Sequence, residues 1–404
     1  MAFPERLLSQ TTRTMGVSFI REMLKATKGV EGMISLAGGL PSPDSFPKAQ
    51  LAGLFKEVIE VEGADVLQYG ASEGDDILKR QILLHEGETA VDLDEVLITD
   101  GATNGIYFFS RAVIDPGDIV VCEAPSFNGS LVAIEACGAE LAGAPMDEEG
   151  LIVERVRDVI RAKRAEGRTV KYIYIIPEFQ NPSGRTMSLA RRRDLIRTAR
   201  EAEVLILEDQ PYRDLRFYGE RLPCLWDLAR SEFGDNHTVT ICKSFSKILG
   251  PGLRLGYAAG PAPLIAAMAK WAQKVIVSPE GVVQRAVARF LERGYMEPHI
   301  ARITGIYRSK RDAIIVALKE MMPSGVRWTE PEGGLFIWVT CPKPIDTDAL
   351  FSEAAKAGVA FIPGAKFYPP GMERRDEMRL NFSYASEADL REGVARLARL
   401  LERS

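Results

Sequence analysis

The sequence has few histidines and cysteines, and neither type is spaced as a metal-binding or redox motif. Its three histidines, His85, His237 and His299, stand too far apart for metal-ligand spacing, so no metal site is expected. The cysteines form no CxxC pair, and we expect buried thiols in preference to disulfides or metal ligands. The five cysteines are Cys122, Cys137, Cys224, Cys242 and Cys341.

A charge excess and a long apolar run are also lacking. The 404 residues include 51 basic and 56 acidic ones, so no overall field favours nucleic acid or a membrane surface as a partner. No apolar run approaches membrane-spanning length, and the amino terminus lacks the layout of a secretory signal. We therefore expect a cytoplasmic protein, whose 46% hydrophobic residues suffice for one large domain and a smaller one.

Short apolar runs alternate with amphipathic segments from about residue 51 to residue 260. This pattern predicts an α/β fold in which a mostly parallel sheet is covered by helices on both faces. Ligands of such sheets bind beyond the carboxyl ends of the strands. The expected strands are Val96–Thr99, Ile119–Cys122, Tyr172–Ile176, Val204–Leu207, Val239–Cys242 and Leu253–Ala258.

Residues that are suited to bind a ligand follow the first four of these strands. Gly101-Ala102-Thr103-Asn104 opens a helix whose free amides and dipole suit a phosphate. Phe127 offers a flat face for a ring, and Asn181 is a donor in a turn fixed by proline and glycine. Asp209 and Tyr212 supply a carboxylate and a phenol after the fourth strand.

The stretch ICKSFSKILGPGLRLGY, which follows the fifth strand, places a lysine beside an expected anion site. Lys247 is suited to form a Schiff base with an aldehyde. Ser244, Ser246 and Arg254 provide donors and a fixed positive charge for a phosphate. The ligand that combines an aldehyde with a phosphate is pyridoxal phosphate, which we expect as the cofactor.

Each of these residues also has an ordinary structural interpretation. Asp209 is a possible N-cap, Asn181 a turn former, and both Phe127 and Tyr212 are possible packing residues. Five successive strand ends that all carry suitable groups favour the cofactor site over five independent structural roles.

Several motifs resemble the fold-type I pyridoxal-phosphate aminotransferases, in particular the branch with the 2-aminoadipate and kynurenine aminotransferases. The resemblance implies an aspartate aminotransferase-like fold, with a large sheet domain and a smaller α+β domain, and a homodimer with shared active sites. It extends from about Ser35 to Ser383 and rests on ISLAGGLPSPDSFP, LQYGASEGD, FQNPSG, EDQPYRDL, SFSKILGPGLRLGY, EGGLFIW and MRLNFS.

The resemblance also implies a role for each site residue. Lys247 would bind the cofactor aldehyde, Asp209 would hold the pyridine nitrogen protonated, and Phe127 would stack on the ring. Asn181 and Tyr212 would bond its phenolic oxygen. The phosphate would be held by Gly101, Ala102, Thr103, Ser244, Ser246 and Arg254, with Tyr69 reaching it from a neighbouring subunit.

The substrate contacts implied by the resemblance centre on Arg379, which would clamp the α-carboxylate through two parallel hydrogen bonds. From the sequence alone, a surface arginine on a strand edge is the other interpretation. Gly39 would line the substrate pocket, and Arg21 is a candidate contact for a distal carboxylate. Phe127 stands where the family usually has tyrosine, and Gln210 and the Ala102-Thr103-Asn104 run also depart from its pattern, so the amino donor stays open.

The expected organisation has three parts. Residues 1–47 form an N-terminal arm, with a short helix near Val17–Ala26, and a substrate-lining loop over Ile34–Pro47. Residues 48–291 form the large cofactor-binding domain, and residues 292–404 the small domain. In the small domain Gly334–Thr340 and Met378–Phe382 are strand-like. A last helix follows, capped by Ser386, with Leu390, Val394, Leu397 and Leu401 on its core face.

We therefore expect an aminotransferase that moves the amino group of a 2-aminoadipate, aromatic or branched-chain amino acid to a 2-oxo acid, with 2-oxoglutarate as the acceptor. A pyridoxal-phosphate lyase or decarboxylase on the same scaffold is the alternative, because Lys247, Asp209 and Arg379 would serve those reactions too. A ligand-sensing module, as in winged-helix regulators, is a weaker alternative, because no DNA-binding segment precedes the domain in this sequence.

Overall fold

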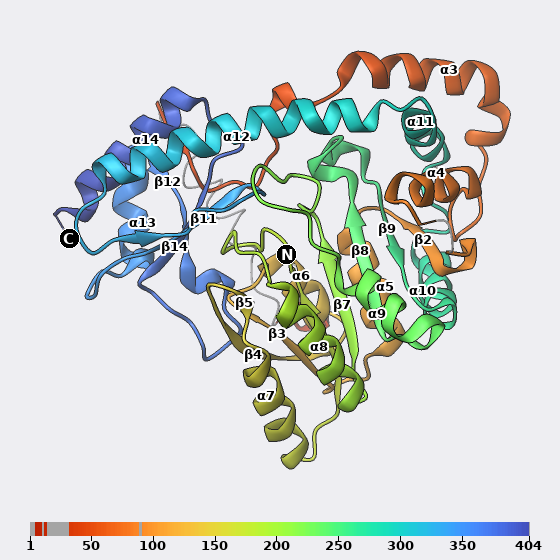
Figure 1. Ribbon diagram of the computed structural model, residues 1–404, viewed down its shortest axis with the longest axis horizontal. Helices are drawn as coiled ribbons and strands as arrows, with labels where there is room; N and C mark the ends of the chain where they lie inside the picture. The colour runs from red at the N-terminus through yellow and green to blue at the C-terminus, as the bar shows by residue number, and fades with distance from the viewer. Residues whose placement is uncertain (1–4, 10–11, 14–31, 89–90, 404) are drawn as a thin grey trace.

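An eight-stranded sheet forms the centre of the protein in the computed structural model, which describes residues 5–9, 12–13, 32–88 and 91–403 (Figure 1). In the spatial order given below, the second strand is antiparallel to both of its neighbours and the last strand is antiparallel to the one before it. All other neighbouring strands are parallel. The sheet is therefore mostly parallel, as the sequence predicts. In spatial order its strands are β2 (Val96–Thr99), β9 (Gly256–Ala259), β8 (Val239–Ser244), β7 (Leu205–Gln210), β6 (Val170–Ile175), β3 (Ile119–Ala124), β4 (Glu140–Asp147) and β5 (Gly150–Leu151).

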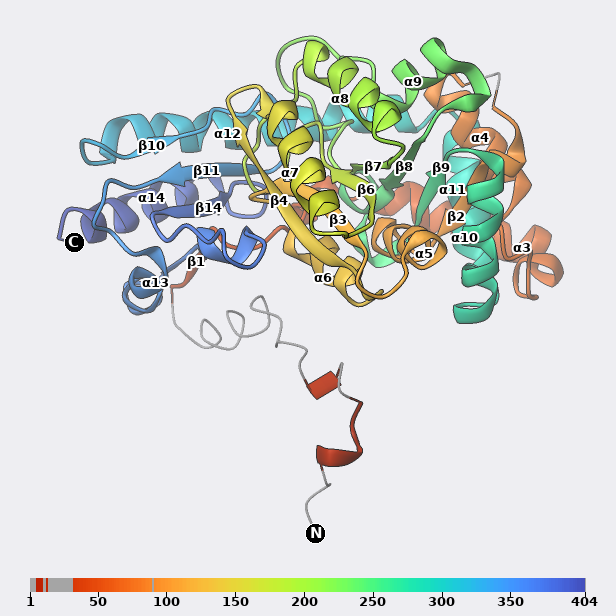
Figure 2. The same cartoon turned by 90° about the horizontal axis from the view of Figure 1, so that it is seen from below.

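Helices cover both faces of this sheet (Figure 2). Alternate strand residues point to opposite faces, so each strand contributes to two cores. One core joins Val120 and Tyr172 to α5 (Ala102–Val113), α6 (Asn128–Glu135) and α10 (Ala262–Val275). The other core lies under α3 (Lys48–Val66), α4 (Asp76–Glu86), α7 (Val153–Ala165), α8 (Leu189–Glu201), α9 (Leu225–Phe233) and α11 (Gly281–Glu292).

A second, antiparallel sheet lies beside the first, and its strands come from the C-terminal part of the sequence (Figure 1). Its strand order is β10 (Arg327–Trp328), β11 (Phe336–Thr340), β14 (Glu377–Asn381), β13 (Ile362–Pro363). The remaining strands, β1 (Ile34–Ser35) and β12 (Val359–Ala360), pair in parallel and attach the segment after residue 32 to this part of the chain. The helices here are α12 (Met296–Met321), α13 (Thr347–Lys356) and α14 (Glu387–Leu401), and α12 runs from the second sheet to the neighbourhood of α11.

The expected strands and the last helix are confirmed with small shifts in their ends. On α14 the four expected core residues are buried, and Asp389 N–H donates to the Ser386 hydroxyl at the N-cap. The strand predicted from Leu253 starts only at Gly256. Its first residues are wrong because Pro251–Leu253 form a 3₁₀ turn and Arg254 has a left-handed φ of 48°.

Two predictions about secondary structure were wrong, one on the strands of the sheet and one on the loop near the N-terminus. The sequence analysis missed β4 and β5, because ELAGAPMD in β4 contains glycine, proline and two alanines, which are rare in strands. The loop expected over Ile34–Pro47 contains a short strand, β1, and a 3₁₀ turn at Pro43–Ser45. The helix expected near Val17–Ala26 lies outside the described residues.

All five cysteines are buried and free, as expected. Among the described residues, no helix is long and apolar enough to cross a membrane.

Candidate active site

Lys247 lies just beyond the end of β8, in the 3₁₀ turn Phe245–Lys247. The turn begins where the Ser244 hydroxyl accepts a hydrogen bond from Ser246 N–H over 3.1 Å. The Lys247 ammonium nitrogen Nζ donates to the Gly39 carbonyl over 2.8 Å, so the loop after β1 reaches the lysine. Burial is the main cause that lowers the pKa of Lys247 to about 8, and the positive charges of Arg379 and Arg254 contribute to the same shift.

Asp209 is buried on β7, with only 3% of its surface exposed. Its Oδ2 accepts a hydrogen bond from the Tyr174 hydroxyl over 2.7 Å, whereas its buried Oδ1 has no hydrogen-bond partner among the described residues. Burial raises the pKa of Asp209 to about 6, although the Tyr174 hydrogen bond lowers it. A buried acceptor without a partner suits a ligand that brings an N–H donor, above all a positively charged one.

Arg379, Asn181 and Tyr212 form a buried polar chain. Arg379 Nη1 donates to Asn181 Oδ1 over 2.8 Å, and the Asn181 amide nitrogen lies 3.4 Å from the Tyr212 hydroxyl. The second guanidinium nitrogen, Nη2, donates to the Ala37 carbonyl over 2.7 Å. The guanidinium carbon lies 4.1 Å from the centre of the Phe336 ring. The alternative of a surface arginine is therefore wrong, because Arg379 is only 3% exposed.

The protonation states within this chain favour hydrogen-bond donation. Burial raises the pKa of Tyr212 above its ordinary value, so its hydroxyl stays protonated. Burial lowers the pKa of Arg379 to about 10, which still leaves the guanidinium charged at neutral pH. The buried Nε of Arg379 has no hydrogen-bond partner among the described residues, so this side chain has donor capacity left for an anion.

Several of the expected phosphate residues lie close together at the amino end of α5. Gly101 precedes the helix with a left-handed φ of 85°, and a Cβ there would lie 2.9 Å from the Arg254 guanidinium. A Cβ on Gly256 would lie 2.9 Å from Ala102 N, and Gly256 is the register partner of Ser244. The glycines thus allow a helix start, a serine and an arginine to come close together.

Two further residues of the predicted site are not joined to these contacts by a hydrogen bond or ion pair among the described residues, and a third lies outside those residues. Phe127 is half-buried at the start of α6, and its ring lies so close to Gly129 that a Cβ there would be 2.6 Å from it. Tyr69 follows α3 and is 80% exposed. Arg21 lies outside the described residues.

The sequence analysis missed four groups around these side chains: the Tyr174 hydroxyl, the Ala37 carbonyl, Phe336 and Gly256. Tyr174 had a usable signal, because it is the register partner of Leu207 on β7, and Asp209, two residues on, points to the same face. The Ala37 carbonyl had none, since a backbone acceptor can lie anywhere in a loop. The roles of Phe336 and Gly256 come only from close packing between different elements, which the sequence does not show.

Comparisons with known proteins agree over almost the whole chain. The family model described as aminotransferase class I and II matches residues 32–397. An aromatic-amino-acid aminotransferase of Thermococcus litoralis is 36% identical over 403 residues, which cover 98% of this chain and 94% of the relative. A 2-aminoadipate transaminase of Thermus thermophilus is 34% identical over 385 residues, covering 95% and 94% of the two chains.

Solved structures give the same result. The kynurenine aminotransferase of Pyrococcus horikoshii, in complex with PMP, has a TM-score of 0.93 at 36% identity, covering 99% of this chain and 98% of its own. LysN of Thermus thermophilus, an α-aminoadipate aminotransferase complexed with a phosphopyridoxyl-leucine, has a TM-score of 0.89 at 31% identity, with 99% and 98% covered.

Proposed function

We propose a reaction for this chain on the premise that it belongs to the class I and II aminotransferases, which are pyridoxal-phosphate enzymes. It transfers the amino group of an aromatic or 2-aminoadipate-type L-amino acid to 2-oxoglutarate. The observation that carries the site assignment is the buried, unpartnered Oδ1 of Asp209 at the strand-end edge that also holds Lys247.

Asp209 is proposed to bind the ring nitrogen of the cofactor. Oδ1 accepts the N–H of the ring while the Tyr174 hydroxyl keeps Oδ2 in place. The bound cofactor supplies an aldehyde that reacts with amines and a ring that withdraws electrons from the substrate Cα. A carboxylate at the ring nitrogen keeps that nitrogen protonated and so strengthens the withdrawal.

Lys247 is proposed both to hold the cofactor and to move the proton. In its neutral form Nζ would accept the proton from the substrate Cα, and the resulting ammonium would return a proton later in the reaction. A pKa of about 8 gives a substantial neutral fraction near physiological pH. The Gly39 carbonyl, 2.8 Å from Nζ, orients the amine.

Arg379 is proposed to bind the α-carboxylate of the substrate, and Asn181 orients both this arginine and the ring. Binding of a carboxylate at Nη2 would exchange with the present bond to the Ala37 carbonyl. Tyr212 and Asn181 donate to the phenolic oxygen of the ring. Phe127 covers the ring, and Gly39 lines the substrate pocket. Together these contacts would orient the substrate so that its Cα–H bond faces Lys247.

The phosphate is proposed to lie at the amino end of α5, within reach of the Arg254 guanidinium and the Ser244 and Ser246 hydroxyls. The amides of Ala102 and Thr103 and the dipole of α5 favour an anion there, whereas Gly101 N–H donates to the Thr99 carbonyl over 2.8 Å and shapes the turn that opens the helix. The crowding between Gly101 and Arg254 supports this proposal, because it places a fixed positive charge beside the helix start.

Tyr69 is proposed to complete this phosphate site in a second copy of the chain, so that the enzyme is a homodimer. Because Tyr69 is 80% exposed, a second copy of the chain can cover it. Leu67 and Val277 are also exposed nearby, where the Ser72 hydroxyl donates to the Val277 carbonyl. We place the enzyme in the cytoplasm, and we propose the domain limits 1–47, 48–291 and 292–404.

The donor and the reaction type are tested in one assay. Purified enzyme with pyridoxal phosphate is given a panel of aromatic, branched-chain and dicarboxylic amino acids, each with and without 2-oxoglutarate. We expect 2-oxo acid products only when the acceptor is present. Ammonia or carbon dioxide without an acceptor would indicate a lyase or decarboxylase instead. Activity with dicarboxylic donors would support Arg21 as the distal contact, and its loss in Arg21→Met would identify that side chain.

A further inference from the structure

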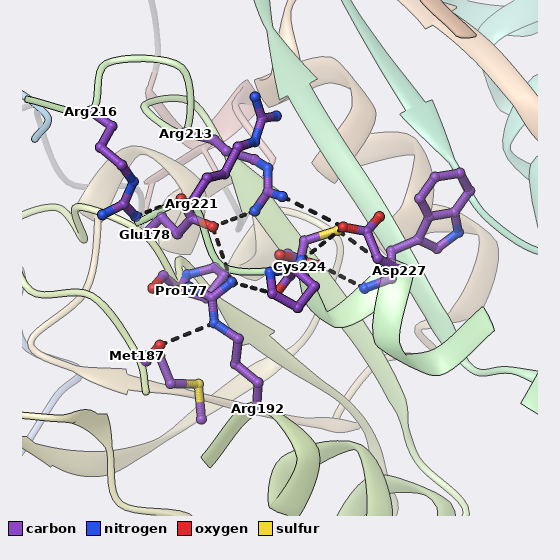
Figure 3. Close-up of polar contacts among 12 residues, drawn as sticks. Pro177, Glu178, Met187, Arg192, Arg213, Arg216, Arg221, Cys224 and Asp227 are labelled. Atoms are coloured by element: carbon purple, nitrogen blue, oxygen red, sulfur yellow. Dashed lines mark hydrogen bonds and ion pairs between the residues drawn. The ribbon is translucent and has the colours of Figure 1, made fainter. Parts of the chain in front are cut away.

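A buried ion-pair cluster lies beneath the ends of β6 and β7 (Figure 3). At its centre is the carboxylate of Glu178, which is 4% exposed. Arg192 Nη1 donates to Glu178 Oε1 over 3.0 Å, Arg216 Nη2 to Oε2 over 3.3 Å, and Arg213 pairs with Oε1 as well. We call these four residues the Glu178 cluster. A buried carboxylate is costly unless it is paired, so these contacts fix the positions of all four side chains.

The cluster is anchored to the surrounding fold. Arg192 on α8 is fully buried, and it also donates to the Met187 and Pro223 carbonyls. Arg213 forms a further ion pair with Asp227 on α9, at 3.5 Å. The carboxylate therefore holds its neighbours against two helices of the large sheet.

The same carboxylate connects two loops of the candidate site. Glu178 is three residues before Asn181 in the loop after β6, and Arg213 directly follows Tyr212 in the loop after β7. The two loops are therefore in contact at two points. One is the ion pair between Glu178 and Arg213, and the other is the hydrogen bond between Asn181 and Tyr212. Movement of either loop would change the distance between these two donors.

Between Glu178 and Asn181 the backbone has an unusual conformation. Phe179 has a φ of 50°, a left-handed value that is rare for a bulky side chain. Cβ atoms at Gly333 and Gly334 would lie 2.4 and 2.6 Å from Phe179 side-chain atoms, so the two glycines admit the ring. The Arg216 guanidinium, held by Glu178, lies 4.7 Å from the centre of that ring. The cluster and the glycines together hold this conformation.

We propose that Glu178 is a positioning residue for the enzyme reaction. Through Arg213 and Arg216 it fixes the loop positions from which Asn181 and Tyr212 donate to the phenolic oxygen of the cofactor. The inference rests on the proposed function, because it assigns the target of those two donors. Glu178 itself touches neither cofactor nor substrate in this account.

The test is Glu178→Gln, which preserves shape but removes the charge that binds three guanidinium groups. We expect the pH midpoint of the visible absorbance of bound cofactor to rise by about half a pH unit. When Asn181 and Tyr212 donate less well, more negative charge stays on the phenolic oxygen of the cofactor. This charge stabilises the proton on the nearby Lys247 nitrogen, so a higher pH is needed to remove it. We also expect kcat to fall about 10-fold or more. A purely structural role would lower the free energy of unfolding without moving the midpoint.

The control is Glu320→Gln, which breaks the exposed ion pair between Glu320 and Arg391 and is expected to keep the wild-type midpoint. If Glu178→Gln fails to fold, Arg216→Met replaces it, and a smaller rise is expected. An unchanged midpoint in a folded variant, or failure of both variants to fold beside a folded control, would overturn the positioning role. A wild-type protein without cofactor absorbance or amino transfer would instead overturn the proposed function.

Discussion

At the scale of single residues, the site depends on groups whose ordinary solution behaviour is altered by burial. Desolvation lowers the pKa of Lys247 to about 8 and raises that of Asp209 to about 6. The first change leaves a fraction of the amine neutral near physiological pH, and the second still leaves a carboxylate at pH 7. A positively charged ring nitrogen at Oδ1 would stabilise the ionised form of Asp209 further, so its pKa should fall when the cofactor binds.

Lys247→Ala should remove the visible absorbance of bound cofactor and lower turnover by about 10³-fold or more, because the amine that holds the aldehyde and moves the proton is lost. Absorbance spectra and single-turnover kinetics measure the two effects. The exposed Lys274→Ala is the matched control and should behave as wild type. A wild-type spectrum for the first variant would refute the assignment.

Asp209→Asn should keep the cofactor attached to Lys247 but lower kcat by about 10² to 10⁴-fold, because a neutral amide no longer holds the ring nitrogen protonated. Stopped-flow measurement of Cα proton removal reports this step. Asp115→Asn, at a side chain that is 86% exposed, is the control. Equal rates for the two variants would contradict the role of Asp209.

At the scale of elements, strand ends and helix starts carry the chemistry. The chain leaves β8 at Ser244 and enters β9 at Gly256, and between them lie Lys247 and Arg254. Gly256 and Gly101 admit close contact between this connection and the start of α5. The same edge of the sheet also carries the loops after β6 and β7. The parallel direction of the central strands is the reason that these connections meet.

Gly101→Ala should weaken cofactor binding by about 10-fold, since its φ of 85° disfavours a side chain and a Cβ would meet the Arg254 guanidinium. Titration of the apoenzyme with pyridoxal phosphate, followed by absorbance, gives the dissociation constant. Gly53→Ala is the control, because no atom lies within 4 Å of a Cβ built there. Unchanged affinity would argue against a phosphate at the start of α5.

Glu123, at the end of β3, should make the stability of the apoenzyme depend on pH. Burial raises its pKa to about 8, although Ile176 N–H and the Gln180 amide donate to it. A raised carboxyl pKa means that the folded state retains the proton. The contribution of Glu123 to the free energy of unfolding is therefore complete below its unfolded pKa, which is about 4.5. This contribution is lost as the pH rises through about 8.

The expected loss from Glu123 is about 4 kcal/mol between about pH 5 and about pH 9, and Glu123→Gln should remove most of it. Urea unfolding of the apoenzyme across this range measures the difference. Glu148→Gln, at a side chain that is 90% exposed, should retain the wild-type pH dependence. Parallel curves for wild type and Glu123→Gln would show that Glu123 does not titrate in this range.

At the scale of the whole molecule, two sheets contribute to one site. Arg379 comes from β14 of the second sheet, whereas Asn181, Asp209 and Lys247 come from the large sheet. The segment after β1 supplies the carbonyls that contact Arg379 and Lys247. Relative movement of the two sheets would therefore open or close the proposed substrate position. Tyr69, which follows α3 and is 80% exposed, is proposed to reach the site of a second copy.

Subunit complementation tests that arrangement. Lys247→Ala and Tyr69→Ala chains should each have low activity alone. If the site is shared, refolding an equal mixture should restore about a quarter of wild-type activity, because half the dimers would contain one complete site. Hydrodynamic mass should correspond to two chains. No recovery in a mixture that forms heterodimers, or a fully active monomer, would exclude a role for Tyr69 across subunits.

The sequence by itself determined that a mostly parallel sheet forms, most of its strands and the polar residues at the ends of those strands. These are local signals, because apolar runs form strands and the residues after them face the ligand edge. Only the tertiary structure decided that Arg379 is buried and donates to the carbonyl of Ala37, 342 positions away in the sequence. It also decided that Tyr174 holds Asp209 and that Glu178 gathers three arginines. Apart from the face on which Tyr174 lies, which the alternation along β6 indicates, these contacts depend on how distant segments pack, and no local pattern encodes them.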